Sequence, residues 1–153
     1  MSIQPFMKQV ESFTVTGFRV RTQNSDEFNE KTAKLPSLWQ QFYSSELATN
    51  TRVFGVYSNY ASDAHGLYTV TVGVEASPAD PQLSSVSIHS GNYLVFHGTG
   101  PMPSTVVDVW KQVWAFFEGN KDHRRNFISD FEVYEGAERV MIYIGLEQFK
   151  IDD

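Results

Sequence analysis

A single glutamate set among aromatic residues is the feature of this sequence best suited to chemistry. Glu132 lies in the segment FEVY, two residues before Tyr134, and the similar segment FGVY carries Tyr57 at the matching position. The face of a tyrosine ring attracts a cation, and a half-buried carboxylate without a partner is stabilised by a nearby positive charge. These residue types therefore favour a binding site for a flat, apolar cation.

The alternation of side chains along the predicted strands selects the companions of Glu132. The last strand carries an aliphatic face, which we expect beneath the helices, and the same reasoning places Phe54 and Phe131 beneath them. Glu132 is then expected on the opposite, open face, beside glycines that let a ligand approach the backbone. The predicted ligand-binding residues are Glu132, Tyr134, Tyr57, Tyr143, Trp110, Met141 and Tyr93.

Other interpretations of the same residues stay open. Glu132 could act as a general acid with Tyr134, which would make the protein a small hydrolase of reactive electrophilic compounds. Otherwise no catalytic residue is assigned, and the sequence favours binding over catalysis. A strand glutamate can also be simply solvated, and tyrosines can simply cap an open sheet face. A protein-interaction module, such as an inhibitor of a DNA-processing enzyme, is a further alternative.

The overall composition excludes several classes of protein. The chain has no cysteine, and its four histidines lack the spacing of a zinc site, so we expect neither metal nor cofactor. The net charge of -6 argues against direct binding of nucleic acid. No apolar run approaches the roughly 20 residues of a membrane span, and no signal peptide is apparent. We therefore expect a cytoplasmic protein that contacts no membrane.

An internal repeat predicts the architecture of the chain. FGVYS resembles FEVYE, VTVGVE resembles IYIGLE, and Trp39 aligns with Trp114 at an offset of 75 residues. Residues 1–153 are expected to form one domain with half-repeats at about 8–77 and 85–149. Each half begins with a strand, Val10–Arg21 in the first, and continues as helix, strand and strand. The predicted α+β fold is an antiparallel sheet with two helices on one face and a pseudo-two-fold axis.

The chain resembles the GyrI-like small-molecule-binding domains, which are also the effector-binding domains of AraC-type regulators. The matching segments include VTGFRVRT, LPSLWQQF, SGNYLVFHGTGPMP, VWKQVWAFF and DFEVY, and together they span about Val10 to Leu146. The resemblance implies binding of amphipathic or cationic molecules at the junction of the halves. It also implies that the glutamate of the aromatic-Glu-x-Tyr segment, here Glu132, anchors the positive charge. The ending YIGLE departs from the Ile-Pro-Ile/Leu of many relatives.

The regulators of this family carry a DNA-binding module, for which this sequence has no room. The resemblance therefore implies a stand-alone sensor or sequestering protein whose partner is a small aromatic cation. A separate regulator protein and a second copy of the chain stay open as partners. Some stand-alone relatives are associated with protection of DNA gyrase from toxins, and others with hydrolysis of ring-strained compounds.

Overall fold

The computed structural model describes residues 4–49, 52–63, 65–76, 81–120 and 122–147. The first half of the chain contains β1 (Phe6–Val10), β2 (Thr14–Thr22), α1 (Asn24–Glu27), α2 (Leu35–Tyr43), the 3-10 helix η1 (Glu46–Thr49), β3 (Arg52–Ser58) and β4 (Tyr68–Glu75). The second half contains β5 (Ser84–Ser87), β6 (Gly91–Thr99), α3 (Ser104–Gly119), β7 (Ser129–Glu135) and β8 (Arg139–Gly145).

The strands form one antiparallel sheet in the order β1-β6-β8-β7-β3-β4-β2-β5. The unit β2-α2-β3-β4 repeats as β6-α3-β7-β8, and the two units meet where β7 pairs with β3. The predicted duplication and fold class are confirmed. The expected first strand is divided, because β1 leaves its own half to pair with β6, and β5 likewise pairs with β2.

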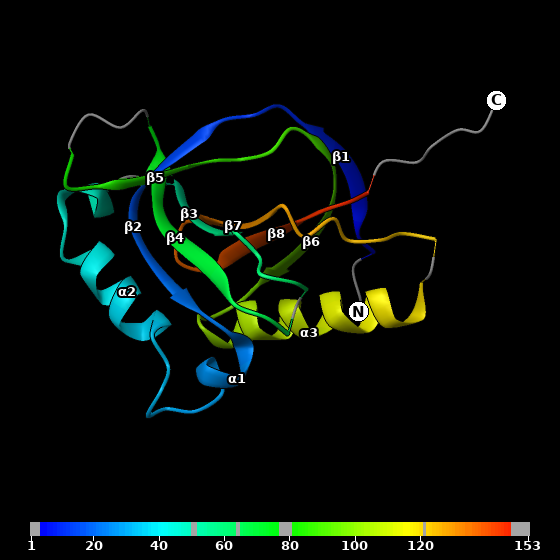
Figure 1. Ribbon diagram of the computed structural model, residues 1–153, viewed down its shortest axis with the longest axis horizontal. Coiled ribbons are helices and arrows are strands. Elements are labelled where there is room, and N and C mark those ends of the chain that lie inside the picture. Colours follow the sequence, from blue (N-terminus) through cyan, green and yellow to red (C-terminus); the bar gives the residue numbers. More distant parts are fainter. Residues whose placement is uncertain (1–3, 50–51, 64, 77–80, 121, 148–153) are drawn as a thin grey trace.

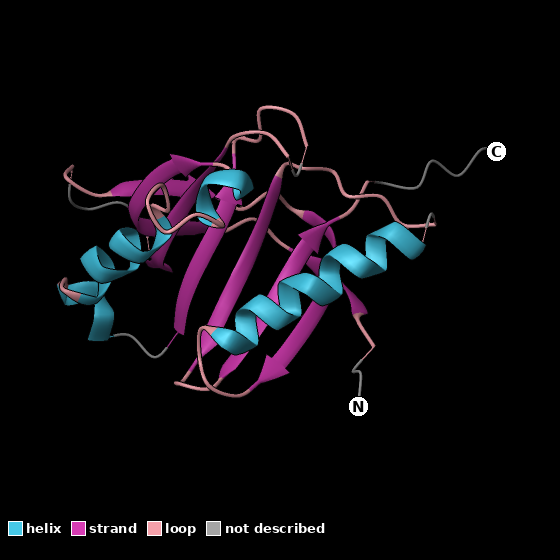
Figure 2. Cartoon of the chain, turned by 90° about the horizontal axis from the view of Figure 1, so that it is seen from below, coloured by secondary structure: helices cyan, strands magenta, loops and turns pink. Residues whose placement is uncertain are grey.

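Both main helices lie on the same face of the sheet, with the short α1 between them (Figures 1 and 2). In α2, Pro36 occupies the first turn, where its missing N–H costs nothing, and Leu38 and Phe42 are buried. In α3, Val109 and Val113 are buried one turn apart. Each helix thus packs a narrow apolar stripe on the strands of its own half.

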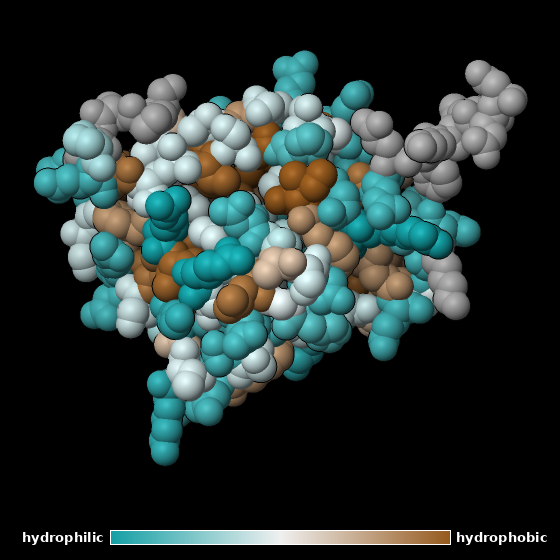
Figure 3. Space-filling model, in the orientation of Figure 1, coloured by the Kyte–Doolittle hydropathy of each residue, from teal (hydrophilic) through white to brown (hydrophobic). Residues whose placement is uncertain are grey.

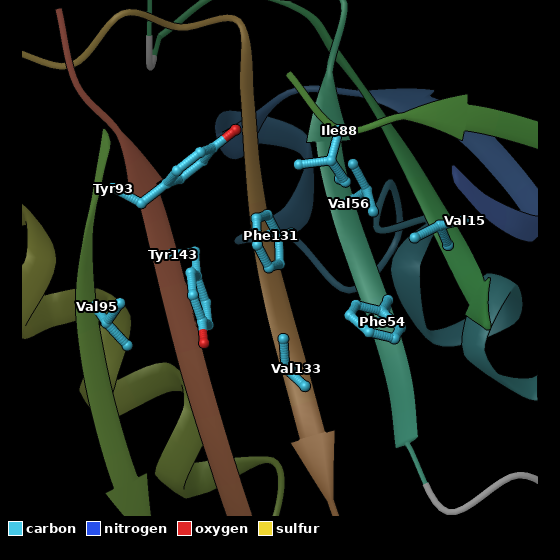
Figure 4. Packing of buried hydrophobic residues seen from close by; sticks show 9 residues of the cluster. All are labelled: Val15, Phe54, Val56, Ile88, Tyr93, Val95, Phe131, Val133 and Tyr143. Atoms are coloured by element: carbon cyan, nitrogen blue, oxygen red, sulfur yellow. The ribbon is translucent and has the colours of Figure 1, made fainter. Parts of the chain in front are cut away.

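The opposite face of the sheet is buried too, contrary to the open face expected from the sequence. Phe54, Phe131 and Tyr143 project from adjacent strands into a core on that side (Figure 4). Phe13 and Ile88, which precede β2 and β6, pack against it. Because both faces are apolar, hydrophobicity alone does not show which one lies beneath the helices.

The strand register corrects the predicted faces of β3 and β7. Glu132 pairs with Ile142, which packs against α3, so Glu132 and its neighbour Tyr134 lie on the helix-covered face. Gly55 pairs with Glu132, which puts Gly55 and Tyr57 on that face as well. The predicted placement of Phe131 and Phe54 beneath the helices is wrong, whereas the aliphatic faces of β4 and β8 are assigned correctly.

Candidate functional site

Glu132 lies on one of the two central strands, on the face that carries α2 and α3, and only 3% of it is exposed. Across the pseudo-two-fold axis, its partner on β3 is Gly55, the matching residue of the repeat. A Cβ atom at Gly55 would lie 2.8 Å from Glu132 Oε1 and 3.5 Å from the Trp39 ring. The missing side chain at Gly55 therefore makes room for the carboxylate.

The Glu132 carboxylate accepts hydrogen bonds from side chains of both halves of the chain. Trp110 Nε1 on α3 donates to Oε2 over 2.6 Å, and Tyr57 Oη on β3 donates to the same oxygen over 3.1 Å. Tyr134 Oη donates to Oε1 over 2.8 Å. All of these donors are uncharged, so they orient the carboxylate and leave its charge uncompensated.

Aromatic rings surround the carboxylate on both sides. Trp110 packs on Tyr57 with ring centroids 5.1 Å apart, and Trp39 packs on Tyr134 at the same separation. Trp110 also lies 6.2 Å from Trp114, one turn further along α3. Each half thus supplies tryptophan and tyrosine rings, whose faces attract positive charge.

Burial is the largest influence on the pKa of the Glu132 carboxylate. It raises the pKa of Glu132 above its ordinary value, and the hydrogen bonds from Trp110, Tyr134 and Tyr57 offset only part of that rise. The pKa values of Tyr57 and Tyr134 are also raised, first by burial and then by the adjacent carboxylate. The ion pairs found among the described residues, Arg52–Glu135 and Arg125–Asp130, do not involve Glu132.

The structure brings together four of the predicted site residues and separates the other three from them. Glu132, Tyr134, Tyr57 and Trp110 form the hydrogen-bonded group. Tyr143, Met141 and Tyr93 belong to the core on the opposite face of the sheet. There the Tyr93 hydroxyl donates to the backbone carbonyl of His89, and the Tyr143 ring stacks on Phe131.

Gly55 is one of the glycines that the sequence places beside Glu132, whereas Trp39 is absent from the predicted site residues. Trp39 is half-buried, its ring lies 3.5 Å from the Cβ position of Gly55, and its centroid is 5.1 Å from that of the Tyr134 ring. The alignment of FGVYS with FEVYE contained the signal. Gly55 occupies the position of Glu132 in the other half, and the pairing of β3 with β7 places the two residues directly opposite each other on adjacent strands.

Two hollows of the described surface lie away from Glu132. One of about 610 Å³ is lined by residues such as Arg19, Arg21 and Thr69, and another of about 380 Å³ by residues such as Asn120 and Glu147. No group of three or more metal-ligating side chains is found in the described ranges. None of the helices described there is long and apolar enough to cross a membrane.

The duplicated sheet, with both helices on one face, is the architecture of the GyrI-like effector-binding domains. More narrowly, the chain belongs to the family of integron-associated effector binding proteins, Cass2, whose family model matches residues 7–146.

Known proteins resemble this chain in sequence, in fold or in both. The integron cassette protein VCH_CASS2 from the mobile metagenome of Vibrio cholerae is 36% identical, with a TM-score of 0.87, over 94% of this chain and 96% of that one. YobU of Bacillus subtilis (strain 168), named for a suggested role as a transcriptional regulator, is 28% identical over 130 residues, covering 78% of this chain and 79% of YobU. The structure of SAV2435 bound to tetraphenylphosphonium shares the fold, with a TM-score of 0.75 and 15% identity over 95% of this chain and 94% of that one.

Proposed function

We propose that the protein binds amphipathic organic cations between α2 and α3, with Glu132 as the anchor for the positive charge. The observation that carries this proposal is a buried carboxylate that has only uncharged donors among the described residues. Burying an ionised group without a countercharge is costly, so a cationic ligand would be favoured by relieving that cost.

The surrounding rings favour an organic cation over a small inorganic ion. Trp39 and Trp110 flank the carboxylate, and rings of this kind bind the face of a bulky, weakly hydrated cation. A metal ion would instead need several oxygen or nitrogen ligands, whereas Glu132 is the only carboxylate in the hydrogen-bonded group described above. The aromatic surroundings therefore support an apolar cation.

Binding requires the side chains that cover Glu132 to move. Glu132 is 3% exposed, and its oxygens are covered by Trp110, Tyr57 and Tyr134, so a ligand reaches the carboxylate only if these rings shift. Trp39 and Trp110 belong to different helices, so a change in the spacing of α2 and α3 would separate the two walls. Changes of side-chain rotamer are common on binding, and a substantial minority of complexes also show larger rearrangements.

The comparisons agree with a ligand of this class. The family is described as effector binding, and a protein of the same fold has been solved with tetraphenylphosphonium, an aromatic cation. We infer that this chain acts as a sensor or a sequestering protein for such compounds. On the face shown in Figure 3, hydrophobic residues appear in small areas among hydrophilic ones.

A matched pair of ligands tests the proposal. Tetraphenylphosphonium and tetraphenylborate have nearly the same size and shape and carry opposite charges. Titration of each would be followed by tryptophan fluorescence, since the chain's 3 tryptophans are Trp39, Trp110 and Trp114, and all lie in the aromatic group around Glu132. We expect saturable binding of the cation and at least tenfold weaker binding of the anion. Equal binding of the two would overturn the proposal.

A further inference from the structure

The segment between β2 and α2 lies on the helix-covered face of the sheet, which is also the face of Glu132 (Figure 2). It includes α1, which lies between the two main helices (Figure 2). Hydrogen bonds fix both of its ends: Tyr68 Oη donates to Asn24 Oδ1 over 2.6 Å, and the Glu27 carboxylate accepts the backbone N–H groups of Lys34 and Leu35. The segment is thus anchored at both ends, with Phe28 between them.

Phe28 has the largest exposed fraction, 75%, among the large hydrophobic residues described as exposed. Its ring nevertheless contacts the site, because it meets the edge of Trp114 with centroids 6.2 Å apart. The next most exposed ring, Tyr43 at 61%, stacks on Trp39 at 5.9 Å. The two most exposed rings of this set therefore both lie against tryptophans of the candidate site, where a bound ligand could cover them.

A continuous series of rings leads from Phe28 to the carboxylate. Phe28 packs on Trp114, Trp114 on Trp110, and Trp110 donates its N–H to Glu132. A cation placed at Glu132 has no reason to reach Phe28 unless it carries substituents that extend along these rings. Only a large ligand is therefore expected to contact both Glu132 and Phe28.

We propose that Phe28 is a ligand-contacting residue that selects cations carrying several aryl rings. This inference rests on the function proposed above. Phe28 adds no charge recognition, which belongs to Glu132; it supplies apolar aromatic surface to the part of the ligand furthest from the positive charge. The preferred ligand is consequently a bulky monocation with aryl groups rather than a small quaternary ammonium ion.

The variant Phe28→Ala tests this role with two cations, tetraphenylphosphonium and the single-ring benzyltrimethylammonium. We expect the affinity for tetraphenylphosphonium to fall roughly 3- to 10-fold, as for loss of one aromatic contact. The affinity for benzyltrimethylammonium should change less than about twofold on the same scale. Phe6→Ala removes a 48% exposed ring from β1 and serves as the control, with no expected effect on either ligand.

The outcomes separate this inference from the function on which it rests. If Glu132→Gln weakens both cations while Phe28→Ala behaves like Phe6→Ala, only the role of Phe28 is wrong. An equal loss of both cations in Phe28→Ala would also overturn the size selection. If the parent protein binds neither cation, or Glu132→Gln binds both unchanged, the proposed function fails and this inference fails with it.

Discussion

Replacing Glu132 by glutamine removes one negative charge from the candidate site with little change in side-chain volume. A cation whose charge lies about 4–5 Å from the carboxylate is attracted by about 3–4 kcal/mol at an effective dielectric constant of about 20. The cost of desolvating the cation offsets part of this attraction and leaves a net contribution of about 2–3 kcal/mol. Glu132→Gln should therefore weaken tetraphenylphosphonium binding roughly 30- to 150-fold.

Isothermal titration calorimetry at neutral pH measures this loss directly. Glu75→Gln makes the same change of charge at the exposed end of β4 and is the matched control; it should shift the affinity by less than about twofold, since exposed charges are screened. If Glu132→Gln binds within about threefold of the parent, the anchor assignment is refuted.

The thermal stability of Glu132→Gln tests the burial of the carboxylate independently of ligand binding. Burial raises the pKa of Glu132, so the protonated side chain favours folding below the ordinary pKa, and this stability is lost as pH rises through the folded-state pKa. Above the folded-state pKa the ionised carboxylate opposes folding. Glu132→Gln should therefore melt at the same temperature as the parent or higher, which thermal denaturation would show.

Three further variants or conditions probe the surroundings of the anchor. Gly55→Ala should cost about 1–3 kcal/mol of stability and weaken cation binding, because the added Cβ would lie 2.8 Å from Glu132 Oε1; an unchanged melting temperature and affinity would contradict the packing. Cation affinity should fall as pH drops through the raised pKa of Glu132, whereas Glu132→Gln should show no such dependence in parallel titrations. Asp130→Asn should lower stability by about 3–5 kcal/mol in chemical denaturation, because it breaks a 2.7 Å ion pair with Arg125, whose side chain is 8% exposed; a loss below about 1 kcal/mol would argue against a buried ion pair.

The duplication could be predicted from the sequence because its evidence is local. The pairs FGVYS and FEVYE, and Trp39 and Trp114, are visible without any knowledge of the sheet. Helices can be predicted from apolar spacing and from a proline in the first turn, as Leu38, Phe42 and Pro36 of α2 show. These patterns fixed the α+β class and the element order.

The face of the sheet that carries Glu132 could not be predicted in the same way. Alternation shows that Phe131 and Glu132 point in opposite directions, but it does not show which direction leads to the helices. That choice depends on the register between β7 and β8, and on Phe13 and Ile88, which cover the other face from distant parts of the chain. The expectation that Glu132 lies on an open face is therefore wrong, because the face opposite the helices is covered by a second core.

Part of the group around Glu132 can nevertheless be predicted from the sequence. Alternation shows which residues share a face of the sheet, even when it does not show which face the helices cover. Tyr57 and Tyr134 share the face of Glu132 whichever way the sheet is turned. Tyr143 was grouped with them only through the incorrect face of β7, since it pairs with Phe131. The incorrect faces of β3 and β7 thus added residues from the opposite side of the sheet to the predicted site. They did not affect the grouping of Glu132 with Tyr57 and Tyr134.

The most direct test of the central claim is a crystal structure of the protein with tetraphenylphosphonium. We expect the cation between α2 and α3, with its phosphorus beside the Glu132 carboxylate and its phenyl rings against Trp39 and Trp110. The claim is contradicted if the cation instead lies on the opposite face of the sheet, beside Tyr143 and Met141, or in a surface hollow away from Glu132.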